Sequence, residues 1–242
     1  MSFIKKNRTA LYKKFDSIET RRFLSPWLYN GYEIIYREIN LYLHGRTIDL
    51  GCGDLSYGEV LRQRVGNFDT IDIEKRAEGI TFMGDIQNMP MVASNTYDSA
   101  ICLYVFEHIK SPEKALREIY RILKNNGNFI IAVPHLCHLH EEPNDYWRFT
   151  KYGLRHMLEE NGFKIVEMKE DGGLGTFFGH QISTIVLAFF WGVPIINYLV
   201  FFSNKLIFIR LCRLFDLLFD RRKIFASGYV CVATKERNGR MA

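Results

Sequence analysis

The sequence predicts an α/β fold in which a mostly parallel β-sheet is covered by helices on both faces. Strand-like and helix-like segments alternate through the middle of the chain, which is typical of parallel β–α–β connections. The clearest strand is Thr47–Leu50, a short apolar run that ends in a turn containing Gly51 and Gly53. Helix-like residues 58–64 follow. A strand, a glycine turn and a helix form the first half of a nucleotide-binding unit.

The residues after this turn distinguish between nucleotide ligands. A dinucleotide-binding fingerprint requires a third glycine three residues after Gly53, and this chain has Ser56 there. Residues 68–73 are predicted to be a second strand that carries Asp72 near its end. A carboxylate at that point can accept hydrogen bonds from both ribose hydroxyls. The pattern therefore disfavours hydride transfer and keeps a ribose-containing ligand.

Length and cysteine content point to one cytoplasmic α/β domain with an addition. The chain has 242 residues, enough to bury a core within a single domain. Its five cysteines show no C-x-x-C spacing, which argues against a disulfide framework or a zinc ribbon. Polar and charged residues follow Met1–Lys6, so we expect no signal peptide and a cytoplasmic location.

The formal net charge of +5 is concentrated in two basic clusters. The clusters comprise Lys5, Lys6, Arg8, Lys13 and Lys14 near the start, and Arg210, Arg213, Arg221, Arg222 and Lys223 near the end. Such clusters face nucleic acid or an anionic membrane, or they form a solvated surface. Because no nucleic-acid-binding module is recognisable, nucleic acid is not the expected partner.

Helix and strand signals can be placed along the chain in order. Residues 1–24 form a basic arm without strong periodicity, and a helix capped by Ser25 is predicted to run to Leu43. Ser111 begins a second helix that we expect residues 124–127 to close, and Thr150 caps a third that ends at Asn161. Residues 163–168 and 226–234 are predicted to be strands.

Five pieces of the chain, in matching order and spacing, resemble class I methyltransferases that use S-adenosylmethionine. They are Ile48–Gly53 for the glycine turn, Asp72 for the ribose, Gly84–Ile86 beside the adenine, Tyr97–His108 for the fourth strand and Gly127–Pro134 for the fifth. The resemblance covers about residues 40–170 and 226–235 and implies a seven-stranded sheet. The chain departs from the family at Leu55, where a third glycine is common.

The resemblance implies S-adenosylmethionine as the cofactor and assigns a set of residues to it. These residues are Asp49, Gly51, Gly53, Asp72, Ile73, Asp85, Ile86 and Leu103. A binding or scaffold protein that keeps the fold without turnover is the alternative from another class. The presence of both ribose and adenine acids argues against that alternative.

Catalytic groups are expected between Pro134 and Arg148, because reacting groups gather at the carboxyl ends of strands in open α/β sheets. Methyl transfer needs positioning and, for a hydroxyl acceptor, a base that titrates near neutral pH. We predict His140 as the first candidate base and His135 as the second, with Asp145 as an orienter of His140 or an alternative base. Loop hydrogen bonding is the competing role for each. The His-x-His and Glu-Glu spacing matches no closed zinc pattern, so we predict no metal.

Two sequence motifs, one present and one absent, narrow the class of molecule that accepts the methyl group. The motif from His140 to Tyr146, followed by Arg148–Thr150, looks like methyltransferases associated with bacterial polysaccharide and glycolipid biosynthesis. The Asn/Asp-Pro-Pro-aromatic motif of base-amine methyltransferases is replaced by residues 103–108. We therefore expect O-methylation of a saccharide or a lipid-linked glycan. A hydrophobic phenol or quinone precursor is the alternative, and an RNA hydroxyl stays open.

Residues 172–225 form an apolar helical insertion before the last strand. No charged residue occurs between Ile182 and Phe202, and Gly192 and Pro194 divide this stretch into two halves. Both flanking strands belong to one sheet, so a single membrane crossing is excluded. Residues 205–220 continue as an amphipathic helix, predicted to carry Arg210, Arg213, Asp216 and Asp220 on one face, and basic residues 221–223 close it.

This insertion favours peripheral membrane contact through residues 182–223, because apolar burial and attraction to anionic lipid act together. The inner face of the cell membrane is then the expected site, and a lid over the substrate or a dimer interface is the alternative. The predicted organisation is a basic arm (1–24), a methyltransferase domain (25–171 and 226–235) and the insertion (172–225). The oligomeric state does not follow from the sequence.

Overall fold

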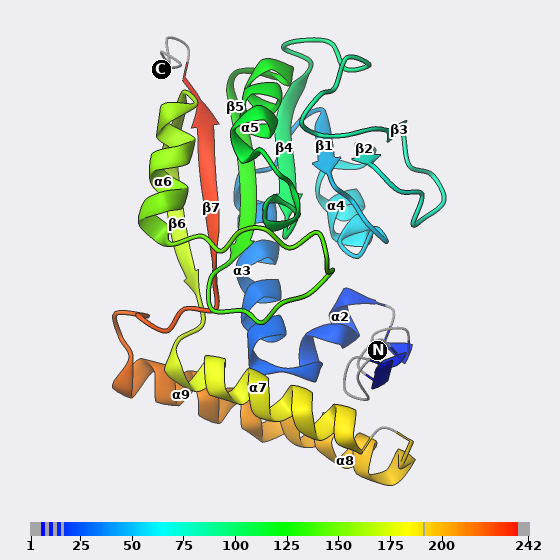
Figure 1. Ribbon diagram of the computed structural model, residues 1–242, viewed down its shortest axis with the longest axis vertical. Helices are drawn as coiled ribbons and strands as arrows, with labels where there is room; N and C mark the ends of the chain where they lie inside the picture. Colours follow the sequence, from blue (N-terminus) through cyan, green and yellow to red (C-terminus); the bar gives the residue numbers. More distant parts are fainter. Residues whose placement is uncertain (1–5, 8–9, 12–13, 16, 191, 237–242) are drawn as a thin grey trace. The chain divides into compact units, whose positions relative to one another are not determined.

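The structure, a computed structural model, describes residues 6–7, 10–11, 14–15, 17–190 and 192–236. Lys5, Arg8 and Lys13 of the predicted N-terminal basic cluster lie outside the described residues. Within the described part, seven strands form one sheet in the order β3-β2-β1-β4-β5-β7-β6 (Figure 1). Strands β1 to β5 pair in parallel, and β7 is antiparallel to β5. The predicted seven-stranded, mostly parallel sheet is confirmed.

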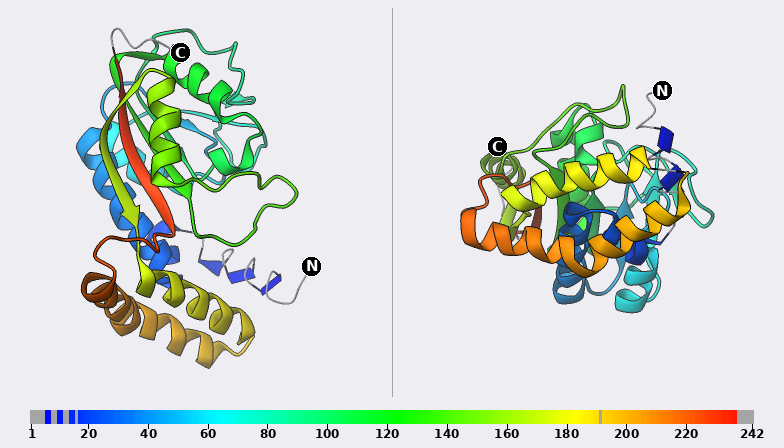
Figure 2. Two further views of the ribbon diagram at one scale, coloured as in Figure 1. Left: turned by 60° about the vertical axis from the view of Figure 1, so that its left-hand side comes forward. Right: turned by 90° about the horizontal axis from the view of Figure 1, so that it is seen from below.

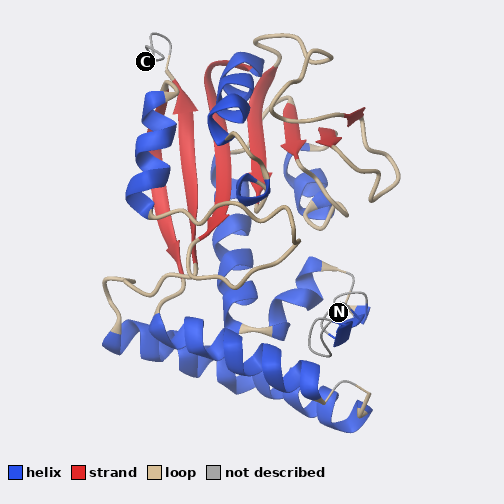
Figure 3. Ribbon diagram, viewed as in Figure 1, coloured by secondary structure: helices blue, strands red, loops and turns tan. Residues whose placement is uncertain are grey.

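Helices cover both faces of this sheet, as expected. Figure 2 shows α4 against one face and α5 and α6 against the other. The strands are β1 (Thr47–Leu50), β2 (Asp69–Asp72), β3 (Phe82–Met83), β4 (Tyr97–Leu103), β5 (Leu123–Pro134), β6 (Phe163–Asp171) and β7 (Gly228–Lys235). Among the described residues, the α-helices are α2 (Ile18–Arg21), α3 (Pro26–Tyr42), α4 (Gly58–Val65), α5 (Pro112–Ile122), α6 (Lys151–Glu160), α7 (Leu174–Phe189), α8 (Pro194–Ser203) and α9 (Ile209–Phe219) (Figure 3). The short helical segments are η1 (Arg22–Leu24), η2 (Phe106–His108) and η3 (Asn204–Phe208).

The centre of the sheet is built from β4 and β5. Ile101 lies opposite Ile130 and Cys102 opposite Ile131, and all four side chains are buried. Nearly continuous apolar runs, rather than alternation, are what a sheet covered on both faces requires. This packing holds the carboxyl ends of β1, β4 and β5 at one edge of the sheet, where the candidate site is built.

Local sequence signals explain the helix boundaries of this part. The Ser25 hydroxyl accepts a hydrogen bond from the Leu28 N–H, and the Thr150 hydroxyl accepts one from the Gly153 N–H. Both are N-caps, which satisfy backbone donors that have no partner within the helix. Pro112 occupies the first turn of α5, where the missing N–H costs nothing. The predicted helix starts are confirmed.

Strand β5 begins earlier than predicted. Residues 124–127 were expected to close α5, but β5 starts at Leu123, directly after the helix. Leu123 lies opposite Tyr97 in the sheet, and the Thr96 N–H donates to the Ile122 carbonyl. The sheet therefore captures this segment through pairing with β4, a long-range interaction that the local sequence does not reveal.

The chain divides into two compact units. The sheet unit comprises residues 35–169 and 228–242. The helical unit comprises residues 1–34 and 170–227. The insertion thus groups with the N-terminal residues and with the first part of α3, an association that the sequence prediction of a separate arm did not contain.

Within the helical unit, the insertion folds as a helical hairpin (Figure 1). Helix α7 ends at Phe189 and α8 begins at Pro194. Helix α8 continues through the π-helical segment η3 into α9, so that Ile195–Phe219 is one helix of 25 residues. The predicted break at Gly192 and Pro194 is confirmed, whereas the helix of residues 205–220 is continuous with α8. A Cβ on Gly175 would lie 2.6 Å from the Cys212 carbonyl oxygen, so a small residue is needed for α7 to approach α9.

The predicted grouping of two arginines and two acids on one face of this helix is wrong. Asp216 and Asp220 are buried, whereas Arg210 and Arg213 are exposed. The Asp216 carboxylate accepts hydrogen bonds from the Gly175 N–H (2.6 Å) and from the Thr176 hydroxyl (2.5 Å). These acids cap the amino end of α7, where the helix dipole and the unpaired N–H groups favour negative charge.

The N-terminal arm takes part in the helical unit. Leu11 and Leu24 are buried together with Leu187 of α7, and Phe15 stacks on Phe201 of α8 at 4.8 Å between ring centroids. Apolar residues of the arm therefore pack on the hairpin, which the absence of helical periodicity in the sequence concealed.

Candidate functional site

A glycine turn at the carboxyl end of β1 leaves an open cradle. Gly51 and Gly53 have φ values of +73° and +54°, in the left-handed region that favours glycine. A Cβ on Gly53 would meet no atom within 4 Å, so this backbone is accessible to a ligand. A Cβ on Gly51 would lie 2.5 Å from Val105 Cγ2, so only glycine permits this approach to the segment after β4. Leu55, at the family's glycine position, also has a positive φ of +58°.

Asp72 lies beside this cradle, at the end of β2. One oxygen of its carboxylate accepts the Gly53 N–H at 2.8 Å, and the other accepts the Glu74 N–H at 2.9 Å. Each carboxylate oxygen has a second lone pair, so the group can still accept hydrogen bonds from a ligand. The predicted ribose acid is therefore oriented by backbone on both sides.

Asp49, at the end of β1, is buried in the same region. Desolvation, and then the nearby Asp72 carboxylate, raise the pKa of Asp49 to about 7. Burial disfavours the charged form, and a second carboxylate adds repulsion. Two neighbouring carboxylates create a site that favours a positively charged ligand.

The other predicted cofactor residues differ in how far their side chains are exposed. Ile73 follows Asp72 and its side chain is 69% exposed, so it can contact a ligand. Asp85 is half-buried and accepts the Gln87 N–H at 2.8 Å, and Leu103 is half-buried at the end of β4. The Ile86 side chain belongs to the core, so this residue can offer a ligand only its backbone.

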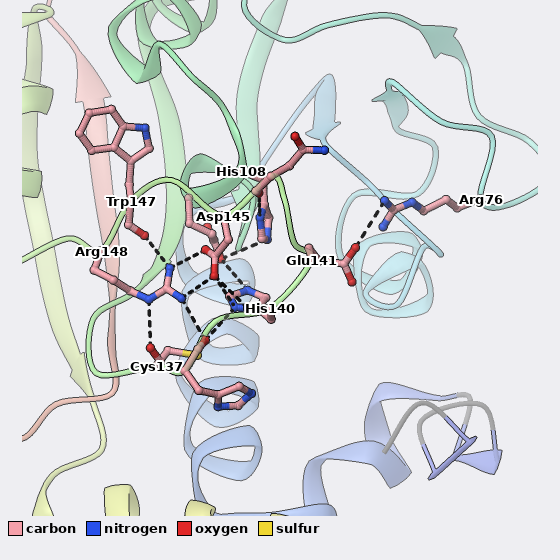
Figure 4. A network of polar contacts seen from close by, with 11 residues as sticks. Arg76, His108, Cys137, His140, Glu141, Asp145, Trp147 and Arg148 are labelled. Atoms are coloured by element: carbon pink, nitrogen blue, oxygen red, sulfur yellow. Dashed lines mark hydrogen bonds and ion pairs between the residues drawn. The ribbon is translucent and has the colours of Figure 1, made fainter. Parts of the chain in front are cut away.

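The loop after β5 is held by an arginine–aspartate pair (Figure 4). Arg148 donates to both Asp145 oxygens at 2.6 and 2.7 Å, and to the carbonyl oxygens of Cys137 and His138. Asp145 also accepts the His140 N–H at 2.9 Å. Arg148 lowers the pKa of Asp145 to about 2. A carboxylate with so low a pKa is a weak proton acceptor, so its contacts favour the orienting role.

The same loop is fixed onto η2, the short turn after β4. The Tyr146 N–H donates to the Glu107 carbonyl at 2.8 Å, and the Trp147 indole donates to the Ile109 carbonyl at 2.9 Å. Farther along, Glu141 lies 4.0 Å from Arg76, in the segment after β2 (Figure 4). These contacts bring the predicted catalytic loop over the carboxyl end of β4.

Glu107 is the functional candidate that the sequence analysis missed. Its side chain is fully buried, and neither oxygen has a hydrogen-bond partner within the described residues. Its Oε1 lies 3.7 Å from His140 Nε2 and 3.8 Å from His108 Nε2. A Glu-His pair just after a strand was the available signal, but the convergence with His140 depends on the fold of the loop.

The two predicted bases have opposite electrostatic environments. Contacts with the Cys137 thiol and then with Glu107 raise the pKa of His140 to about 10. Burial lowers the pKa of His135, whose Nδ1 makes no hydrogen bond within the described residues. Near neutral pH, His140 is therefore a proton donor, and His135 is the neutral imidazole able to accept a proton.

A large hollow elsewhere on the sheet unit is not this site. It measures about 760 Å³ and is lined by Asn126 at the start of β5 and by Thr234 and Lys235 at the end of the antiparallel β7. It therefore lies at the opposite edge of the sheet from the glycine turn. Ligands of open α/β sheets bind at the carboxyl ends of the parallel strands.

The fold and the glycine turn define a class I methyltransferase. The chain belongs to the methyltransferase domain family, whose model matches residues 34–168. It is also 30% identical over 172 residues to an uncharacterised protein of Methanocaldococcus jannaschii, a match that covers 64% of this chain and 74% of the relative.

Solved structures with low sequence identity share the fold. The [4+2]-cyclase SpnF is 14% identical with a TM-score of 0.57, over 86% of this chain and 80% of that chain. A SAM-dependent methyltransferase from Aquifex aeolicus is 20% identical with a TM-score of 0.50, over 67% and 92%. Phosphoethanolamine N-methyltransferase 2 of Haemonchus contortus, in complex with S-adenosyl-L-methionine, is 16% identical with a TM-score of 0.54, over 98% and 60%.

The protein is an S-adenosylmethionine-dependent methyltransferase, and its residues fit that cofactor. The open backbone at Gly53 suits close approach, Asp72 retains acceptor capacity for ribose hydroxyls, and the buried acid pair suits a cationic ligand. When bound, the cofactor supplies an electrophilic methyl group. The residues of the chain would then position the acceptor molecule and accept the proton that it loses.

Replacing Asp72 by alanine is expected to weaken binding of S-adenosylmethionine and of its demethylated product. Loss of two hydrogen bonds to a charged acceptor corresponds to a drop in affinity of about 100-fold or more. Calorimetric titration of the purified protein measures this drop. Glu74→Gln, which changes an exposed acid two residues away, is the matched control and should bind normally. Equal affinities for Asp72→Ala and the wild type would remove Asp72 from the site.

Replacing Asp49 by asparagine is expected to flatten the pH dependence of stability without cofactor. The pKa of Asp49 is higher in the folded state (about 7) than the ordinary aspartate value of 3.8, so the folded protein binds more protons between these values. The free energy of unfolding of the wild type should therefore fall as pH rises through this window, by at most about 1.4 kcal/mol per pH unit.

Urea unfolding at pH 5, 6, 7 and 8 measures this difference. Asp54→Asn, an exposed acid in the same turn, is the control and should keep the wild-type slope. Parallel profiles for Asp49→Asn and the wild type would show that Asp49 does not titrate in this range.

Proposed function

We propose that this methyltransferase acts at a membrane surface and O-methylates a hydroxyl of a saccharide carried on a lipid. The observation that carries this proposal is the organisation of the helical unit, which buries polar side chains and exposes apolar ones. The motif from His140 to Arg148 adds support, because it resembles enzymes of polysaccharide and glycolipid biosynthesis. The inner face of the cell membrane is the proposed location.

A soluble helix pair buries apolar side chains and exposes polar ones. This hairpin buries several polar side chains and exposes many apolar ones. Its buried side chains include Ser183, Asn204 and Asp216. The Ser183 hydroxyl donates to Asn204 Oδ1 at 3.1 Å, and Asn204 Nδ2 donates to the Leu24 carbonyl at 3.1 Å, so these two buried side chains have internal partners. In lipid, every polar group must find an internal partner, whereas apolar groups need none.

Most of the exposed side chains of the hairpin are apolar. Ile195 of α8 is 74% exposed and Phe219 of α9 is 68% exposed. Other exposed apolar side chains are Ile182, Ile185, Phe189, Leu199, Phe202, Leu206, Ile207, Leu211, Leu214, Leu217 and Leu218. Only 17% of the most apolar stretch of the helix Ile195–Phe219 is buried, so it is not the core helix of a soluble domain.

The length of the uncharged part fits one leaflet. From Ile195 to Lys205, the first charged residue of this helix, is a rise of about 15 Å at 1.5 Å per residue. That is half of the roughly 30 Å hydrocarbon core of a bilayer. Helix Ile195–Phe219 is long and apolar enough to span a membrane. Its partner α7 is shorter, so we propose a hairpin whose tip enters one leaflet and returns.

The exposed positive charges of the hairpin favour an anionic bilayer as the partner of its apolar surface. Arg210, Arg213, Arg221 and Arg222 are exposed, and none forms an ion pair within the described residues. The two acids of the same segment are buried as caps of α7. Positive charge beside an apolar surface favours contact with anionic phospholipid, each cation adding about 1 kcal/mol near the surface.

The acceptor chemistry fits the groups that surround the catalytic loop. A sugar hydroxyl must lose a proton as the methyl group arrives, and His135 is the neutral imidazole available to take it. A lipid-linked saccharide would reach the enzyme from the surface that the hairpin contacts. Hydrophobic phenols or quinone precursors would reach it from the same surface and are the alternative outcome of the acceptor test.

Labelled methyl groups from S-adenosylmethionine are expected to appear in lipid-linked saccharides. The assay incubates the enzyme with a bacterial membrane extract and, separately, with soluble nucleotide sugars and with phenolic quinone precursors. His135→Gln should lower kcat by about 100-fold or more, whereas the affinity for the cofactor stays unchanged. His156→Gln, an exposed histidine of α6, is the control. Label confined to phenolic compounds would replace the saccharide proposal with the alternative.

Binding to vesicles is expected to depend on the hairpin tip. The full-length protein should float with vesicles that contain phosphatidylglycerol, and less with phosphatidylcholine alone. Ile195→Asp combined with Leu199→Asp should abolish flotation, because charge in the hydrocarbon core costs about 3 kcal/mol per residue. Tyr152→Asp, at an exposed aromatic residue of α6, is the matched control.

Two results would contradict the membrane proposal. One is that the double variant floats as well as the wild type. The other is that the wild type does not bind vesicles but sediments as a dimer that the double variant disrupts, which would make the hairpin an interface between copies of the chain.

A further inference from the structure

Three side chains at the carboxyl end of β4 converge on one point. Glu107 and His108 come from η2. His140 comes from the loop after β5, and Figure 4 shows it beside His108. One ligand atom from each lies within 4.8 Å of the others. All three residues belong to the sheet unit.

The hydrogen bonds of the two imidazoles fix which nitrogen faces the carboxylate. His108 Nδ1 lies 2.6 Å from the Asn144 carbonyl oxygen, and His140 Nδ1 lies 3.2 Å from the His138 carbonyl oxygen. A carbonyl oxygen can only accept, so each Nδ1 carries a hydrogen. Both Nε2 atoms are then directed at Glu107. This is the arrangement in which metal-binding histidines are held, with the other ring nitrogen donating to a carbonyl or carboxylate.

The carboxylate at the centre of this cluster needs a positive partner. Glu107 is fully buried, and neither of its oxygens accepts a hydrogen bond within the described residues. A buried carboxylate without hydrogen bonds is costly unless a cation lies against it. Either a proton on an imidazole or a metal ion can fill that role.

We propose that Glu107, His108 and His140 bind a first-row divalent transition-metal ion. Two imidazoles and one carboxylate are the donor set of mononuclear zinc and iron(II) sites, whereas Mg²⁺ prefers oxygen ligands. Three protein ligands leave open coordination positions, as in catalytic rather than structural sites. This proposal revises the sequence prediction of no metal, which rested on spacing within the loop and did not include Glu107.

The position of this cluster near the cofactor cradle suggests a catalytic role for the ion. This role rests on the proposed function. Val105, against which Gly51 of the cofactor cradle packs, is two residues before Glu107. The open positions of the ion would therefore lie close to the cradle. There the ion would hold the acceptor oxygen and lower the pKa of its hydroxyl.

The proposal is tested with Co²⁺ as a spectroscopic probe and without any acceptor. The full-length, tag-free protein, stripped with a chelator, is titrated with Co²⁺ and followed by its visible absorption. We expect one equivalent to bind and to be displaced by Zn²⁺ but not by excess Mg²⁺. Glu107→Gln and His140→Asn should each weaken binding by about 100-fold or more. His156→Gln, outside the cluster, should bind as the wild type.

Retained binding of S-adenosylmethionine by the variants shows that they are folded. Wild-type protein that binds the cofactor but no Co²⁺ would overturn the metal proposal and leave an imidazolium–carboxylate pair in its place. Equal Co²⁺ binding by Glu107→Gln and the wild type would also overturn it. Because no acceptor is present, failure of the saccharide proposal cannot produce either result.

Discussion

The close approach of Gly51 to Val105 is the constraint on which the site depends. Only a glycine can occupy that position, because a Cβ would lie 2.5 Å from the valine and because the backbone is left-handed there. The contact joins the turn after β1 to the segment after β4. It thereby fixes the cofactor cradle beside Glu107 and His108, and the Arg148–Asp145 pair then holds His140 over the same point.

The two units differ in which side chains they bury and which they expose. In the sheet unit, apolar strands are covered on both faces, and Asp49, Asp72 and Glu107 lie near the carboxyl ends of the strands. In the helical unit, Asp216, Ser183 and Asn204 are buried and hydrogen-bonded, and many of the exposed side chains of the hairpin are apolar. An enzyme with both arrangements is suited to a soluble cofactor and a lipid-linked acceptor, which is the substrate pairing that we propose.

The sequence predicted those parts of the fold and of the site that depend on residues close together in the chain. The turn at Gly51 and Gly53, the acid Asp72 and the caps Ser25 and Thr150 depend on a few neighbouring residues, and each was found from the sequence. Glu107 was not found, because its importance comes from burial and from a loop 33 residues later in the chain. The start of β5 and the burial of Asp216 were missed for the same reason, since pairing with β4 and packing on α7 decide them.

Hydrogen exchange on the full-length protein tests the central claim, that a cofactor unit and a membrane unit work in one chain. S-adenosylmethionine should slow exchange at residues 51–57 and 72–74 and leave α7 and α8 unchanged. Vesicles containing phosphatidylglycerol should slow exchange at residues 182–204 and leave the glycine turn unchanged. Protection of the glycine turn by vesicles, or of neither segment by its ligand, would contradict this account.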